Sequence, residues 1–260
     1  MKLNFIINEY FLLTKALQRS YKSKKDPFWK PWHILDEKLW KKLNNSLFYQ
    51  LINPGDYGLY TSLEVSNPKA EKIYKNLIKQ TKNEFKKIFK TPPFKKLMEE
   101  TQAYSKTVQQ RWSKKEKDIY SFLEQITGLK IPNLKPNIII VHPKLSCGRS
   151  YSEIQSIVWG HKEDWNSYST VYLAHELLHL IFDYYKIPLD DLSHSLIELI
   201  SDNELRFFLN KGGKYFKEND ISVGHDNLRS IEKKILPYWK KYLKQNKKNI
   251  IEFYTQMKNI

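Results

Sequence analysis

Two histidines and a glutamate within five residues have the types and spacing of a metal site. They belong to the run His175-Glu176-Leu177-Leu178-His179. Residues four apart lie on one face of a helix, so His175 and His179 can present two imidazole nitrogens to one metal ion. Zn²⁺ prefers tetrahedral nitrogen or oxygen donors at roughly 2 Å. Glu176 is near enough to take a proton from a water bound to that ion.

This window lies inside a strongly helical pattern. Apolar residues recur at helical spacing at Val171, Ala174, Leu178, Ile181, Phe182 and Tyr185. Ser167 or Ser169 is placed to cap the start of the helix, and Pro188 follows its far end. A chance match would leave two partly buried histidines on a core helix. The helical context favours the metal site over that interpretation.

A carboxylate on the next predicted helix can complete such a site. Glu198 and Asp202 lie one turn apart on this helix, which follows a turn at Lys186–Asp191. Two antiparallel helices joined by a short loop bring Glu198 back beside His175 and His179. A catalytic zinc site takes three protein ligands and leaves one position for water. A ligating histidine usually donates its other N–H to a carboxylate. The pattern predicts Glu198 as the third ligand and Asp202 as that carboxylate.

The two predicted helices resemble the active-site helices of the gluzincin metallopeptidases, the group that includes thermolysin. That group carries H-E-x-x-H, followed by E-x-x-x-D on the next helix. The resemblance covers roughly residues 150–210. It implies that His175, His179 and Glu198 are zinc ligands. It also implies that Glu176 is the general base and that Asp202 steadies His175. Thermolysin has an Asn before its Glu ligand, whereas this chain has Ile197, so the second partner of His179 is unassigned.

Peptide hydrolysis also needs a donor for the developing oxyanion. Gluzincins supply a His or Tyr from further along the chain. His225 is the candidate here, because it follows Glu198 and has an acidic neighbour, although no motif assigns it. Three tyrosines are rivals for this role: Tyr184, Tyr215 and Tyr238. His194, one turn before Glu198, either lines the cleft or is exposed.

The expected function is a zinc-dependent peptidase. It would hold one Zn²⁺ ion and hydrolyse peptide bonds of a peptide or protein substrate, with Glu176 as the general base. Two alternatives remain open. One is a latent or regulatory zinc-binding protein whose cleft is blocked by the N-terminal region. The other is a basic, nucleic-acid-associated protein with a structural zinc, which a fourth protein ligand would close.

The net charge of +16 raises nucleic acid as a partner. Only five of the 44 basic residues are Arg, however, and Arg is the residue that specific phosphate and base recognition favours. The lysines are spread over predicted helix faces rather than gathered in one tract. A solvated surface is therefore the favoured interpretation, and nucleic acid the less favoured partner.

The N-terminal segment Met1–Leu17 is apolar but interrupted by Asn4, Asn8 and Glu9. Without a small-residue cleavage site it is expected to be a docking helix rather than a signal peptide. No run approaches the roughly 20 apolar residues of a membrane span. The single cysteine, Cys147, fits a reducing compartment, so a cytoplasmic protein is expected. Its neighbours give little support for a nucleophilic thiol.

The pattern of elements predicts an α+β fold that is mostly α. Residues 1–135 are expected to form a helical region, and residues 136–260 a small zincin-like domain with a short sheet. Helices are expected over 36–50, from Pro68 onward, and over 94–112, 113–127 and 227–245, the last containing Pro237. Strands are expected over 138–141 and 152–160, the second at the sheet edge above the zinc, with a turn over 147–150 between them.

Overall fold

The computed structural model describes residues 1–22, 25–33 and 68–259, which form a mostly helical α+β fold, as predicted. The chain divides into two compact units. Unit 1 comprises Met1–Phe5, Lys106–Ile138 and Gly148–Ile260, and unit 2 comprises Ile6–Ser105 and Ile139–Cys147. Both units contain residues from each side of Pro136, the boundary expected from the sequence.

Unit 2 contains two helices that contact each other, α1 (Glu9–Lys22) and α5 (Pro68–Ile88). The helix expected over Met1–Leu17 begins only at Glu9, because Asn8 Oδ1 accepts a hydrogen bond from Phe11 N at 2.8 Å and caps it. A short strand, β1 (Asn4–Ile6), precedes the cap. The helix expected over 36–50 lies outside the described residues. The buried side chains of this unit include Leu12, Leu13, Trp29, Phe85 and Phe94.

One long helix, α6 (Pro92–Thr127), replaces the two helical stretches expected to meet between Trp112 and Ser113. Ser113 does not cap a new helix. Its hydroxyl donates instead to the Gln109 carbonyl at 2.8 Å, one turn back. The helix ends where predicted, before Gly128, whose φ of 72° leaves the helical region.

A four-stranded sheet has the order β1-β2-β4-β3. Its inner strands β2 (Asn137–Ile140) and β4 (Ser156–Gly160) are almost entirely buried, as the apolar run over 138–141 predicts. β3 (Cys147–Tyr151) lies at one edge of this sheet, so the turn expected over 147–150 is wrong. The edge position expected for 152–160 is wrong too. The chain reverses later, at Gln155, whose φ is 44°, so that β3 extends the sheet beyond β4.

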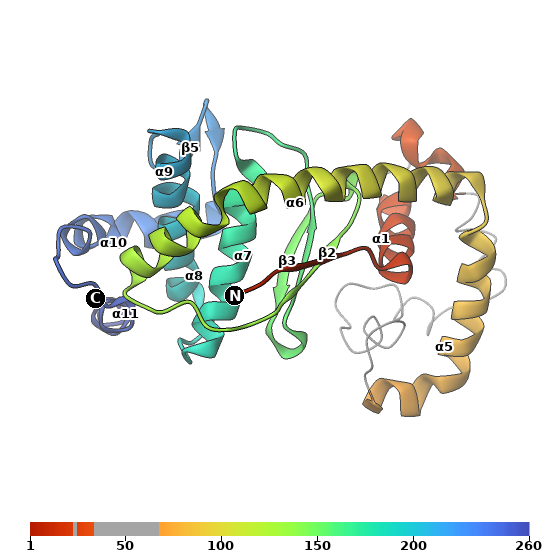
Figure 1. Ribbon diagram of the computed structural model, residues 1–260, viewed down its shortest axis with the longest axis horizontal. Coiled ribbons are helices and arrows are strands. Elements are labelled where there is room, and N and C mark those ends of the chain that lie inside the picture. Colours follow the sequence, from red (N-terminus) through yellow and green to blue (C-terminus); the bar gives the residue numbers. More distant parts are fainter. Residues whose placement is uncertain (23–24, 34–67, 260) are drawn as a thin grey trace. The chain divides into compact units, whose positions relative to one another are not determined.

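Unit 1 holds the two helices that carry the predicted site, α7 (Tyr168–Tyr184) and α8 (Asp191–Glu198), which pack against each other (Figure 1). Ser167 precedes α7 but makes no capping hydrogen bond, because its hydroxyl accepts one from Lys115 Nζ at 2.9 Å. Asp190 caps α8, and its Oδ1 accepts from Ser193 N at 2.8 Å.

The helical path of α8 continues beyond Glu198. A π-helical segment, Leu199–Leu205, leads into α9 (Arg206–Asn210), and Lys211 ends the helix with φ of 58°. Two short strands follow, β5 (Lys217–Glu218) and β6 (Ile221–Ser222). The helix expected over 227–245 begins at Arg229 after one 3₁₀ turn and contains Pro237. It is α10 (Arg229–Tyr242), and α11 (Ile250–Met257) follows it.

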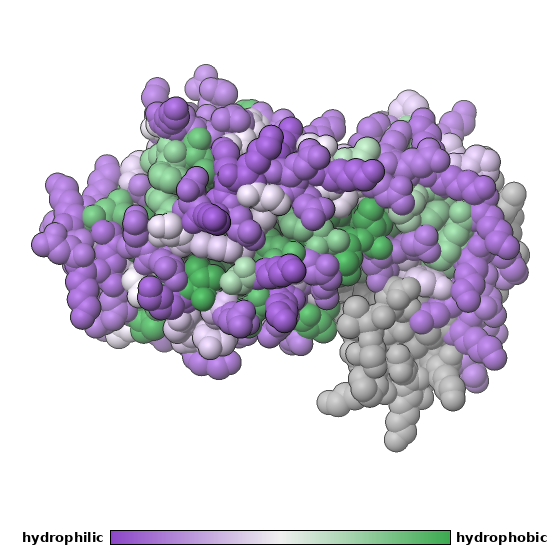
Figure 2. Space-filling model, in the orientation of Figure 1, coloured by the Kyte–Doolittle hydropathy of each residue, from purple (hydrophilic) through white to green (hydrophobic). Residues whose placement is uncertain are grey.

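Hydrophilic side chains cover most of the face shown in Figure 2, with smaller hydrophobic areas between them. This distribution agrees with lysines spread over helix faces. None of the described helices combines the length and the apolar character that crossing a membrane requires.

Candidate metal centre

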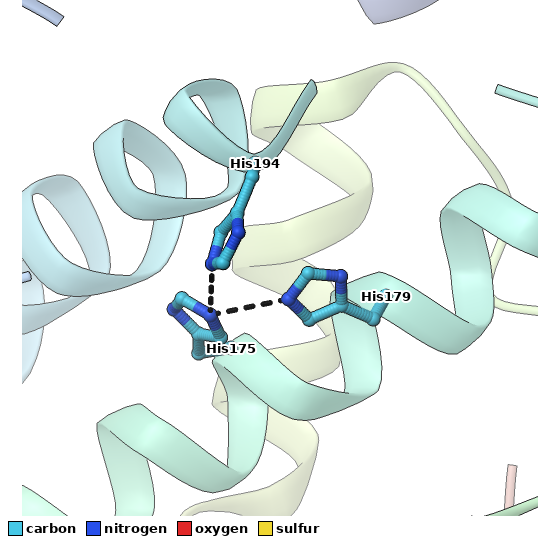
Figure 3. Close-up of side chains that lie close together, drawn as sticks. All are labelled: His175, His179 and His194. Atoms are coloured by element: carbon cyan, nitrogen blue, oxygen red, sulfur yellow. Dashed lines mark hydrogen bonds between the residues drawn. The ribbon is translucent and has the colours of Figure 1, made fainter. Parts of the chain in front are cut away.

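Three imidazole rings converge where α7 and α8 meet (Figure 3). His175 and His179 are one turn apart on α7, as their spacing predicts, and His194 comes from the first turn of α8. Nε2 of His175 lies 3.3 Å from Nε2 of His179 and 3.3 Å from Nε2 of His194. These three residues offer donor atoms that all lie within 4.8 Å of one another, close enough to bind one metal ion.

Asp202 orients His175. Its Oδ1 lies 3.0 Å from Nδ1 of His175 and accepts a hydrogen bond from Ser201 Oγ at 2.7 Å. The aspartate is fully buried, so Nδ1–H of His175 donates to it and Nε2 faces the other two rings. Asp202 thus makes the contact that the sequence predicts.

The protonation states of the three rings are strongly coupled. Burial disfavours a charge on His175, but the Asp202 carboxylate overcomes this and raises the pKa of His175 to about 9. Burial and then repulsion from His175 lower the pKa of His179 to about 2 and that of His194 to about 4. His179 and His194 are therefore neutral at pH 7 and offer lone pairs, whereas His175 releases its Nε2 proton when it binds a cation. Such a donor set fits a divalent cation, and Zn²⁺ suits it well.

Glu198 is fully buried next to this cluster and is turned toward His225. Both of its carboxylate oxygens accept from the backbone N–H of His225 at 3.0 Å, and the Nδ1 of that ring makes a further short contact with Oε1. Oε1 lies 3.9 Å from Nε2 of His194. Glu198 thus forms a second potential ligand group with His194 and His225. Glu198, the predicted third ligand, thus shares a ligand group with His194 but not with His175 and His179.

Two further residues hold Glu198 in this position. Gly224 has φ of 82°, and a side chain there would overlap Oε2 of Glu198, so only glycine lets the His225 backbone approach. Glu232, buried on α10, forms a hydrogen bond with Glu198, and burial followed by the Glu198 charge raises the pKa of Glu232 to about 8.

Glu176 lies beside His175 and interacts with the edge strand β3, where it is hydrogen-bonded to Ser150. Burial raises the pKa of Glu176, although the His175 charge and Ser150 oppose the shift. Gly148 permits the close approach, because a Cβ there would lie 3.3 Å from Oε1 of Glu176. A carboxylate with a raised pKa accepts a proton more readily, as a general base must.

His225, the expected oxyanion donor, lies at the edge of the cluster. Its ring centroid is 4.9 Å from that of His194, and its side chain is 53% exposed. The hydrogen bond with Glu198 raises the pKa of His225 and so favours the charged, donating form. Of its rivals, Tyr215 is hydrogen-bonded to Glu204, whereas Tyr184 and Tyr238 are exposed.

The sequence pattern predicts His194 only as a residue that lines the cleft or is exposed, whereas its ring lies inside the cluster. The available signal was its spacing, because His194 and Glu198 are four residues apart and therefore share a helix face. Tyr172 was missed as well. It lies three residues before His175, the two ring centroids are 6.0 Å apart, and its hydroxyl accepts from Gly224 N at 3.4 Å.

His142 makes its contacts within unit 2. Its Nε2 lies 3.0 Å from Oε2 of Glu100, and its Nδ1 accepts from Lys144 N at 3.3 Å. It thus caps the 3₁₀ turn Pro143–Leu145 that follows it.

Three comparisons with known proteins do not identify the chain. No family model matches it, and neither the curated proteins nor the solved structures include a significant match. The geometry of the site therefore carries the functional argument.

Proposed function

We propose that the protein is a zinc-dependent peptidase. The proposal is supported mainly by the three imidazole Nε2 atoms that converge beside the carboxylate of Glu176, which lies on α7 with His175 and His179. The proposed ligands are His175, His179 and Glu198. When bound, the metal would polarise the scissile carbonyl and lower the pKa of a water molecule.

The protein side chains supply the remaining chemistry. Glu176 accepts the proton of the attacking water and passes it to the leaving amine. Asp202 keeps His175 in the tautomer whose Nε2 lone pair faces the cluster. His225 is proposed as the donor to the oxyanion, because Glu198 favours its protonated form. The edge strand β3 offers backbone groups with which an extended substrate can pair.

One observation favours a second candidate function, a latent or regulatory zinc protein. His194 lies as close to His175 as His179 does and can act as a further ligand. A site closed by four protein ligands lacks a position for water. This alternative keeps the metal but predicts little or no cleavage.

The test compares the wild type with Glu176→Gln. Bound zinc is measured by elemental analysis, and cleavage of a mixed peptide library is followed by mass spectrometry. We expect one zinc per chain in both proteins and cleavage that falls at least about a hundredfold in the variant, as the loss of a general base does. Glu153→Gln, an exposed glutamate of the same unit, serves as the control. Bound zinc without cleavage in any protein would favour the latent alternative, and absence of bound zinc would refute both.

A further inference from the structure

Two distances within the cluster match the edges of a coordination tetrahedron. Two nitrogens bound to one tetrahedral ion at about 2.0 to 2.1 Å lie about 3.3 to 3.4 Å apart. The Nε2 atoms of His175 and His179 are 3.3 Å apart, and those of His175 and His194 are also 3.3 Å apart. His194 therefore meets the same geometric requirement as His179, the ligand that the sequence motif predicts.

The position of Glu198 makes His194 the bridge between two ligand groups. His194 belongs both to the group with His175 and His179 and to the group with Glu198 and His225. Glu198 shares a ligand group with His194 but not with His175 and His179, so binding of all four to one ion requires its carboxylate to turn from His225 toward the other histidines. The set would then contain four protein donors, the number that a closed tetrahedral site requires. A catalytic site would have to give up one of the four.

We propose that His194 is a fourth protein ligand of the metal, that the site rests in this closed state, and that departure of His194 opens it for catalysis. The inference rests on the proposed peptidase function and adds a regulatory step to it. The three predicted zinc ligands stay bound to the metal in this scheme. The exchangeable ligand is His194, which the gluzincin pattern does not include.

His194 is the ligand best suited to leave. Its side chain is 30% exposed, whereas that of His175 is 3% exposed and fixed by Asp202. In the described part of the chain, the side chain of His194 has no hydrogen-bond partner except the Nε2 of His175. It lies in the first turn of α8, directly after the loop that follows α7. A rotation of its side chain into solvent needs no movement of either helix.

A closed resting state has a quantitative consequence. If only a fraction of the molecules is open, the apparent activity and the apparent affinity for an active-site ligand fall to that fraction of their values in the open state. Removing the His194 imidazole should therefore raise the turnover per bound metal while it weakens metal binding. These opposite changes distinguish an exchangeable ligand from a residue that only supports the fold.

The test uses the full chain loaded with Co²⁺, whose visible absorption reports coordination. We compare the wild type with His194→Ala and His194→Gln, with acetohydroxamate as the active-site probe. We expect the Co²⁺ spectra of both variants to differ from that of the wild type, and metal affinity to fall at least about tenfold. We expect acetohydroxamate to bind both variants more tightly than the wild type.

The control is His161→Ala, a histidine of the same unit whose side chain is 27% exposed, close to the value for His194. It should leave the Co²⁺ spectrum, the metal affinity and acetohydroxamate binding unchanged. Circular dichroism identifies the variants that fold. If His194→Ala does not fold, the test relies on His194→Gln, which retains a polar side chain. A wild-type spectrum and affinity in a folded His194 variant would overturn the proposal. Changed spectra without peptide cleavage in any protein would refute the peptidase function and leave His194 as a ligand.

Discussion

Oδ1 of Asp202 lies 3.0 Å from Nδ1 of His175, although 27 residues separate the two in sequence. Both side chains are buried, and Ser201 donates a second hydrogen bond to the same oxygen. The contact joins the π-helical segment to α7 and determines which nitrogen of His175 faces the cluster. The electrostatics of the site therefore depend on a residue that does not belong to the proposed ligand set.

Replacing Asp202 with Asn should weaken metal binding by about 10- to 100-fold, the usual effect of removing a carboxylate behind a ligating histidine. Asn is nearly the same size, so the loss reflects the weaker acceptor rather than a cavity. Competition with a chromogenic chelator measures the affinity. Asp191→Asn, an exposed position at the start of α8, is the control and should bind metal as the wild type does. Equal affinities in the two variants would contradict the role of Asp202.

Gly224→Ala should displace Glu198 and lower metal affinity. The new Cβ would overlap Oε2 of Glu198, and φ of 82° is a strained conformation for alanine, which costs about 1 to 3 kcal/mol. Metal affinity is the decisive readout, because strain alone also reduces stability. Gly212→Ala, at φ of 142° with open space around it, shares the strain without the overlap. Gly212→Ala should unfold more easily yet keep its metal affinity. An equal loss of metal affinity in Gly212→Ala would show that the effect of Gly224→Ala does not come from Glu198.

The sequence predicted the parts of the site that depend on helical periodicity. His175, Glu176 and His179 occupy one helix, as their spacing requires. The short loop returned Glu198 and Asp202 to the same region, because two helices joined by so few residues must lie side by side. Local spacing was sufficient for these placements.

Features that depend on contacts between distant segments were not predictable. The π-helical turns around Asp202 and the loop at Gly224 leave no pattern in the sequence, yet they decide which residue Glu198 faces. The edge strand β3 was mistaken for a turn, because Cys147-Gly148-Arg149-Ser150 contains no apolar alternation. Its strand form comes from its place in the sheet and not from its own residues.

Unit 2 should lose stability as the pH falls below about 6.5, the usual pKa of histidine. Burial lowers the pKa of His142, although Glu100 opposes the shift. Between the folded-state pKa and 6.5 the unfolded chain binds a proton that the folded chain does not. The free energy of unfolding therefore decreases with decreasing pH, by at most about 1.4 kcal/mol per pH unit for this group.

Urea unfolding at pH 7.5 and 5.5 tests this for the wild type, His142→Gln and His161→Gln. The metal-site histidines also titrate, so the comparison between variants is what isolates His142. The difference in unfolding free energy between the two pH values should shrink in His142→Gln and stay the same in His161→Gln. An unchanged difference in His142→Gln would show that this residue does not contribute.

Gly148→Ala should impair catalysis without affecting metal binding. A Cβ at this position would lie 2.9 Å from the Trp159 ring and 3.3 Å from Oε1 of Glu176, so the proposed base must shift by a few tenths of an ångström. We expect kcat/KM to fall about tenfold, equivalent to about 1.4 kcal/mol of transition-state stabilisation. Peptide cleavage and chelator competition, measured on the same samples, separate the two effects.

Cys147→Ala, on the opposite face of the same strand, should change neither quantity. A loss of cleavage in Cys147→Ala would contradict the assignment of Glu176 as the base and point to the thiol instead.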